Sequence, residues 1–259
     1  MTPEISNLVP KVLLALAATW FVLAIIFRLI ILPWLSNGPR EDPAIGFLWR
    51  FVQIQCRLIH RLKVFGDELV PKTIHPGGLI VVANHTGAID PVMIQASCPF
   101  HIRWMMASEM MGTNFDWLWK VEQIIPVDRD GRDTAPTREA IRHVKAGRVL
   151  GIFPEGRIVI PPREIRPFLA GVGLIVHRTK APVLLAWISG TPDTNEMGKS
   201  LLTPSRSRLQ FIEIMDFTGE KHAIDIARKL RERIAEVSGW PVNDEPLPPL
   251  ENDSDPFLH

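Results

Sequence analysis

Two short, uninterrupted apolar runs, each ending abruptly at polar residues, constrain the fold of this chain most strongly. Residues 79–83 stop at Asn84, and residues 149–153 stop at Pro154 and Glu155. Apolar runs of this length without alternation are typical of strands buried on both faces, as in parallel sheets covered by helices. The carboxyl ends of such strands meet at one edge of the sheet, where open α/β folds bind ligands.

Further apolar and amphipathic segments alternate along the chain in the same way. Four more strands are predicted, at 101–107, 124–127, 182–188 and 209–215. Helical spacing of apolar residues predicts three helices, at 135–146, 168–180 and 221–237. The sequence therefore predicts a single α/β domain with a mixed, mostly parallel sheet flanked by helices.

The N-terminal part of the chain carries an apolar segment of a different kind. Residues 12–32 are almost wholly apolar apart from Thr19 and Arg28, which is about the length needed to cross a bilayer core of roughly 30 Å. Only Lys11 precedes the run and no small-residue cleavage site follows before Pro33, so the pattern does not fit a cleavable signal peptide. Whether the segment spans the membrane or lies in it stays open.

Residues 44–63 are predicted to form a second helix, whose apolar positions are interleaved with basic ones. This pattern favours a helix lying in the lipid headgroup layer, and an ordinary amphipathic helix packed on a core is the alternative. Five cations follow the apolar segment, and they predict that the catalytic part stays on the cytoplasmic side: Arg40, Arg50, Arg57, Arg61 and Lys63.

These patterns predict three regions. Residues 1–63 form a membrane-associated helical pair, 64–240 form the α/β domain, and 241–259 form a tail rich in proline and acid that is expected to be disordered. The formal net charge is only +1, so charge provides no case for nucleic-acid binding.

The segment that follows the first buried run contains a candidate catalytic pair. His85 and Asp90 are five positions apart, and a histidine whose second ring nitrogen is held by a carboxylate is suited to act as a general base. The alternative is purely structural, since Asp90 and Pro91 also suit a helix start and His85 alone suits a buried position. No nucleophile motif accompanies the pair, so the base is expected to activate a substrate hydroxyl.

Charged residues follow two other predicted strands. Arg129 comes shortly after the 124–127 strand, and its planar guanidinium suits a phosphate group; pairing with nearby aspartates on the surface is the alternative. Glu155, Gly156 and Arg157 follow the 149–153 strand. The acidic spacing around Arg129 does not match a calcium loop, and no metal site is predicted.

Taken together, four blocks resemble the glycerolipid acyltransferase family, whose best-known members acylate 1-acylglycerol-3-phosphate. The resemblance covers about residues 60 to 217. The blocks are residues 84–91 (N-H-T-G-A-I-D-P), 125–129 (I-P-V-D-R), 153–156 (F-P-E-G) and 181–183 (A-P-V). The blocks at 84–91 and 153–156 are the ones specific to this family.

This resemblance implies the fold, the reaction and the roles of the residues. His85 would deprotonate the acceptor hydroxyl, which attacks the thioester of acyl-CoA or acyl carrier protein, and Asp90 would orient it. Arg129 and Glu155 would help to bind the phosphorylated acceptor, with Gly156 allowing close backbone approach. The reaction needs no cofactor beyond the acyl donor, and the partners would be membrane lipids and a lysophospholipid acceptor.

The chain departs from the family pattern at three positions. Gly87 stands where many members have serine, Arg157 stands where threonine or serine is common, and Leu185 replaces a second proline. Gly87 and Arg157 lie beside the expected acceptor, so Arg157 is a further candidate for acceptor binding, with pairing to Glu164 as the alternative. Three other functions stay open: acylation of another lysolipid, thioester hydrolysis, and lipid binding without catalysis.

Overall fold

The computed structural model describes residues 3–111, 116–128, 134–159 and 163–245. In this part of the chain seven strands form one sheet, in the order β1-β7-β6-β2-β5-β3-β4. Every neighbouring pair is parallel except β6 and β7. The strands are β1 (Lys63–Phe65), β2 (Leu79–Ala83), β3 (Ile102–Ala107), β4 (Ile125–Val127), β5 (Val149–Ile152), β6 (Val183–Ser189) and β7 (Arg208–Met215).

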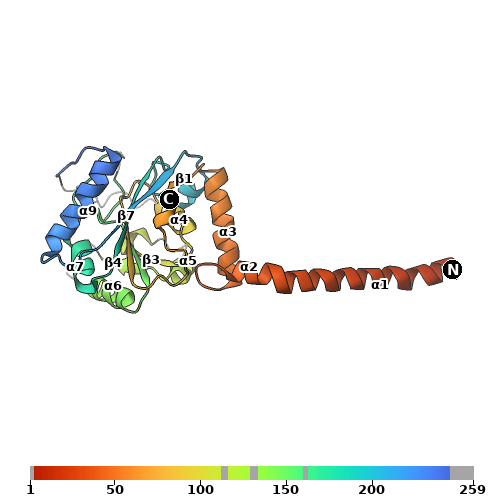
Figure 1. Cartoon of the computed structure of the whole chain (residues 1–259). Coiled ribbons are helices and arrows are strands. Elements are labelled where there is room, and N and C mark those ends of the chain that lie inside the picture. Colours follow the sequence, from red (N-terminus) through yellow and green to blue (C-terminus); the bar gives the residue numbers. More distant parts are fainter. Residues whose placement is uncertain (1–2, 112–115, 129–133, 160–162, 246–259) are drawn as a thin grey trace. The chain divides into compact units, whose positions relative to one another are not determined.

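Helices surround the sheet and precede it (Figure 1). The described helices are α1 (Pro3–Ile26), α2 (Leu32–Ser36), α3 (Pro43–Leu58), α4 (Asp90–Ala96), α5 (Asp116–Glu122), α6 (Ala135–Lys145), α7 (Ala170–Thr179), α8 (Met197–Leu202) and α9 (Ala223–Ser238). A π-helical segment, Phe27–Ile31, joins α1 to α2. The chain divides into two compact units, Met1–Phe51 and Val52–His259, and the division falls inside α3.

The central strand β2 shows how the sequence builds the second unit. All five of its residues are buried, and because side chains alternate along a strand they face two different cores. Leu79, Val81 and Ala83 belong to the core under α4 and α5, whereas Ile80 and Val82 belong to the core under α6, α7 and α9. Figure 1 shows these two groups of helices on opposite faces of the sheet. The predicted fold class is therefore confirmed.

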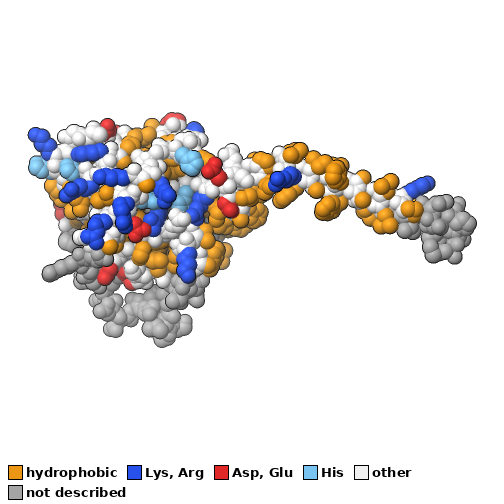
Figure 2. All heavy atoms as spheres, turned by 90° about the horizontal axis from the view of Figure 1, so that it is seen from below, with side chains coloured by type: hydrophobic (Ala, Val, Ile, Leu, Met, Phe, Trp, Pro, Cys, Tyr) orange, Lys and Arg blue, Asp and Glu red, His pale blue; other side chains and the backbone are white. Residues whose placement is uncertain are grey.

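The first unit is helical. The stretch Pro10–Ser36 has a mean hydropathy of 2.5, and in the described part of the chain it is the one helix long and apolar enough to cross a membrane. Figure 2 shows the apolar side chains along it, interrupted by few charged ones. In the first turn of α3, a side chain on Gly46 would overlap the Leu35 carbonyl oxygen. Glycine at this position therefore allows α2 and α3 to approach closely. Arg50 lies over the Trp34 ring, 4.5 Å from its centroid.

The second predicted helix was expected to end too late in the chain. We expected it over 44–63, but α3 ends at Leu58, and Lys63 already begins the edge strand β1, which pairs with β7. Arg61 adopts a φ of 45°, which is incompatible with a continuing α-helix. The six predicted strands are confirmed to within one residue at each end.

One glycine fixes the aromatic packing next to the site. A side chain on Gly151 of β5 would overlap the ring of Trp104, which lies on the neighbouring strand β3. The bare backbone therefore lets the indole lie flat on the sheet, and Trp104 in turn stacks on Phe153 with 4.7 Å between ring centroids.

We predict that Gly151→Ala destabilises the protein by about 1–3 kcal/mol, because the added methyl group and the indole cannot occupy the same space in a packed core. The measurement is urea unfolding in detergent. Gly171→Ala in α7 is the matched control, since nothing lies within 4 Å of the position of its added methyl group, and it is expected to be neutral or slightly stabilising. Equal stability of the two variants would contradict the packing argument.

Candidate active site

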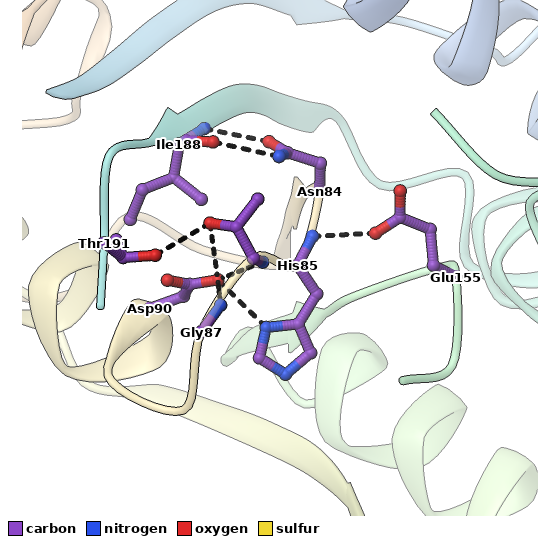
Figure 3. Close-up of polar contacts among 8 residues, drawn as sticks. Asn84, His85, Gly87, Asp90, Glu155, Ile188 and Thr191 are labelled. Carbon is purple, nitrogen blue, oxygen red and sulfur yellow. Dashed lines mark hydrogen bonds and ion pairs between the residues drawn. The ribbon is translucent and has the colours of Figure 1, made fainter. Parts of the chain in front are cut away.

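The site is built where β2, β5 and β6 end, at the carboxyl edge of the sheet. Asn84 follows β2 and ties it to β6: its amide nitrogen donates to the Ile188 carbonyl oxygen at 2.9 Å, and its amide oxygen accepts from the Ile188 N–H at 2.8 Å. Figure 3 shows this double contact above the histidine. The asparagine side chain thus continues the parallel ladder beyond the strand. It fixes the start of the loop 84–90, which holds the candidate catalytic pair and is called the catalytic loop below.

The structure brings His85 and Asp90 together. His85 Nδ1 lies 3.0 Å from Asp90 Oδ2, and the Asp90 side chain is fully buried while that of His85 is 16% exposed. The same oxygen accepts the backbone N–H groups of Thr86 at 2.6 Å and Gly87 at 2.9 Å. The loop between the two residues therefore wraps around the carboxylate (Figure 3).

This arrangement determines which nitrogen of His85 is available for chemistry. A neutral imidazole that donates from Nδ1 to Asp90 keeps its lone pair on Nε2. No described residue forms a hydrogen bond with Nε2, and His85 lines the large cavity next to the site. The face of the ring stacks on Phe153, with centroids 4.0 Å apart and planes inclined by 14°. Asp90 thus holds the ring at Nδ1 and Phe153 covers one face, while Nε2 stays available as far as the described residues show.

Glu155 lies beneath this loop and not in the cavity. It is 5% exposed, its Oε2 accepts the backbone N–H of His85 at 2.7 Å, and its Oε1 is buried with no hydrogen-bond partner among the described residues. Burial, together with the nearby Asp90 carboxylate, raises the pKa of Glu155 to about 8. The family resemblance implied that Glu155 helps to bind the acceptor; in the structure its carboxylate contacts the backbone of His85.

The cavity has a volume of about 500 Å³ and is mostly apolar. It lies where two strands separate: β3 pairs with β5 only over Ile102–Trp104 and then with β4 over Met105–Ala107. The cavity is consequently lined from both sides of the sheet, by Trp104 and Trp119 on one side and by Val172 and Ile175 on the other.

The other predicted site residues have different positions. Gly156 and Arg157 both line the cavity. Gly156 has a φ of 77°, and a side chain there would meet Leu169 at 2.6 Å. Arg129 lies outside the described residues. Glu164, the alternative partner considered for Arg157, accepts a hydrogen bond from the Asn243 amide at 3.0 Å.

Two supports of the site were not predicted from the sequence. Thr191, two residues after β6, places its hydroxyl 2.9 Å from that of Thr86, and Trp104 supports Phe153 from the next strand. The only signal for Thr191 was its place after a predicted strand, and the sequence does not show that β6 lies beside β2. Residues 195–199, which also line the cavity, gave no signal.

Comparison with known proteins is consistent with this geometry. The family model described as Acyltransferase matches residues 61–189, which include the catalytic loop and the end of β5. The chain belongs to the glycerolipid acyltransferase family. Its class of enzyme is therefore acyltransferase, as the sequence predicted.

Two curated relatives and one solved structure are similar to the chain. It is 26% identical over 141 residues to the 1-acyl-sn-glycerol-3-phosphate acyltransferase of Bacillus subtilis (strain 168), covering 53% of this chain and 67% of the relative. It is 25% identical over 165 residues to the N-acylphosphatidylethanolamine synthase of Arabidopsis thaliana, covering 58% of each. The crystal structure of the 1-acyl-sn-glycerophosphate (LPA) acyltransferase PlsC from Thermotoga maritima shares the fold, with a TM-score of 0.58, 23% identity, and coverage of 91% of this chain and 98% of that one.

We predict that Glu155→Gln becomes more stable relative to the unchanged protein as the pH rises. Glu155 keeps its proton up to about pH 8 in the folded protein but loses it near pH 4.5 when unfolded. Between these two values the folded state binds the extra proton, so the stability contributed by Glu155 is complete below pH 4.5 and is lost as the pH rises to about 8.

Glutamine cannot titrate, so the difference in free energy of unfolding should grow by up to about 1.4 kcal/mol per pH unit and level off above pH 8. Urea unfolding of both proteins in the same buffers measures it. A difference that stays constant from pH 5 to 8 would show that Glu155 is already ionised in the folded protein.

Proposed function

We propose that this protein transfers a fatty acyl group from acyl-CoA or acyl carrier protein to the free hydroxyl of a lysophospholipid at a membrane. The proposed acceptor is 1-acylglycerol-3-phosphate, which gives phosphatidic acid. The observation that carries the proposal is the His85 imidazole, which Asp90 holds at Nδ1 while Nε2 bonds to no described residue beside a mostly apolar cavity. The bacterial relative, whose name states this reaction, supports the choice of acceptor.

The chemistry follows from the position of His85. Nε2 takes the proton of the acceptor hydroxyl as its oxygen attacks the carbonyl carbon of the thioester, and Asp90 stabilises the imidazolium that forms. The tetrahedral intermediate collapses with cleavage of the carbon–sulfur bond, and the departing sulfur receives the proton from His85. The products are the acylated lipid and the free thiol, with no acyl group on the enzyme at any stage.

The proposed membrane location rests on the helices of the first unit and on α3. On α3, four large apolar side chains recur three or four residues apart and are exposed: Phe47, Phe51, Ile54 and Leu58. Such a row suits a helix lying at the surface of the bilayer. The basic residues that follow the apolar helix favour a cytoplasmic catalytic unit, so that the lipid acceptor and product stay in the membrane.

We predict that His85→Ala lowers the rate of acyl transfer by about 10²–10⁴-fold, because the general base is lost. The purified protein in detergent is incubated with lysophosphatidic acid and acyl-CoA or acyl carrier protein, and thiol release and acylated lipid are followed together. His177→Ala is the matched control, because His177 lies on α7 but is not among the residues that line the cavity.

The outcomes of this assay separate the candidate functions. Acylated lipid that depends on His85 supports the proposal. Thiol release without acylated lipid from any lysolipid indicates a thioesterase, and product with a different lysolipid only would replace the acceptor. Absence of turnover with every donor and acceptor would favour a lipid-binding protein.

We further predict that Val172→Phe shifts donor preference toward shorter acyl chains. Val172 is buried and lines the cavity on the α7 side, so a larger side chain shortens the space for the acyl tail. Because one methylene group in an apolar pocket changes specificity by roughly tenfold or more, the ratio of long to short products should fall at least about tenfold.

Competition between two acyl donors in one reaction measures this ratio independently of how much protein is folded. An unchanged ratio in Val172→Phe would mean that the acyl tail does not reach the α7 side of the sheet.

A further inference from the structure

A segment outside the residues matched by the family model is joined directly to the catalytic loop. The match ends at residue 189, and residues 191–199 follow it. The Thr191 hydroxyl contacts that of Thr86, and the backbone N–H of Ala88 donates to the Thr194 carbonyl oxygen at 3.2 Å. The end of β6 and the loop that holds His85 are thus fastened together through both side chains and backbone.

Gly87 makes this contact possible. A side chain at this position would lie 2.8 Å from both the Pro192 carbonyl oxygen and the Thr191 hydroxyl. The 191–199 segment therefore occupies the space that a serine at position 87, the residue seen in many members of the family, would need. This departure from the family pattern is explained by the path of the chain after β6.

Helix α8 begins at Met197, near the end of this segment, and forms part of the cavity wall. Met197 and Leu201 of α8 pack on the core under α4 and α5, and Ser200 is fully buried. With one side anchored in this way, the helix presents Gly198 and Lys199 to the cavity that contains His85.

Lys199 brings a positive charge to this wall. It is exposed, and no ion pair of its ammonium group is formed with any described residue. Arg157 lines the same cavity from the end of β5, and the one acidic side chain among the described lining residues is Glu196. The cations therefore exceed the carboxylates around the cavity, which suits an anionic substrate group.

We propose that Lys199 binds the phosphate of the lysophospholipid acceptor, and that residues 195–199, which line the cavity, form the wall that recognises its head group. This inference rests on the proposed function, because the acceptor is the one named there. Acyl-CoA also carries phosphates. In the acceptor, however, only one carbon and one ester oxygen separate the hydroxyl-bearing carbon from phosphorus, whereas the whole pantetheine arm separates the thioester of CoA from its phosphates. A cation in the cavity that holds the base is therefore placed for the acceptor.

The test is steady-state kinetics of Lys199→Ala and Lys199→Arg in mixed micelles. Because a charge-assisted contact contributes about 1.5–3 kcal/mol, Lys199→Ala should raise the KM for lysophosphatidic acid about tenfold or more. The KM for the acyl donor should not change, and arginine should restore most of the acceptor affinity. Monoacylglycerol has no phosphate. With this acceptor, the KM of Lys199→Ala should be close to the KM of the unchanged protein.

Lys145→Ala is the matched control, since Lys145 is exposed on α6 and does not line the cavity. An unchanged acceptor KM in Lys199→Ala overturns the inference. A rise in the donor KM alone also overturns it and assigns Lys199 to the phosphates of CoA.

Binding without turnover distinguishes failure of this inference from failure of the proposed function. Equilibrium binding of radiolabelled lysophosphatidic acid is measured for His85→Ala and for the His85→Ala, Lys199→Ala double variant. Weaker binding by the double variant supports the inference even if the unchanged protein transfers no acyl group. Equal binding in a protein that does transfer acyl groups overturns the inference and leaves the proposed function intact.

Discussion

The site depends on one carboxylate oxygen. Asp90 Oδ2 accepts from the imidazole of His85 and from the backbone N–H groups of Thr86 and Gly87, while Asp90 itself is fully buried. A buried charge is tolerated only when it is paired or well hydrogen-bonded. The loop must therefore keep the conformation that satisfies Oδ2 of Asp90, and this conformation sets the direction of the histidine ring.

Three contacts with the two strands beside β2 hold this loop in place. Asn84 fastens its start to β6, Glu155 accepts the N–H of His85 from the end of β5, and Phe153 covers the imidazole face. Each contact comes from the carboxyl end of a strand adjacent to β2 or from β2 itself. Parallel pairing brings these ends together, so the sheet topology positions residues that are far apart in sequence.

The sequence predicts those parts of the fold that local patterns determine. The apolar run 79–83 matches β2 in both bounds, because the run has the length of a strand and ends abruptly at a polar residue. The edge strand Lys63–Phe65 was not predicted. It has three residues and begins with a charged one, so it is too short to show the alternation of apolar and polar residues that marks a strand. The pairing of His85 with Asp90 was also predicted, since both lie in one short loop.

Contacts that depend on the order of the strands could not be predicted. That Glu155 lies under the His85 backbone requires β5 to lie beside β2, and that Thr191 reaches Thr86 requires β6 on the other side. The family resemblance implied acceptor binding for Glu155, and the structure shows that its buried carboxylate contacts the His85 backbone. The sequence also contains no pattern that marks 195–199 as a wall of the cavity.

The separation of β3 from β5 has a consequence for what the cavity admits. The two strands stay paired over Ile102–Trp104, so the opening between them cannot widen without breaking hydrogen bonds of the sheet. For the proposed reaction, the passage would select acyl tails by cross-section as well as by length. A straight tail can thread between the strands, whereas a methyl branch at that depth would meet rigid main chain. A change in tail specificity would then come from exchanging side chains around the opening, with the sheet left as it is.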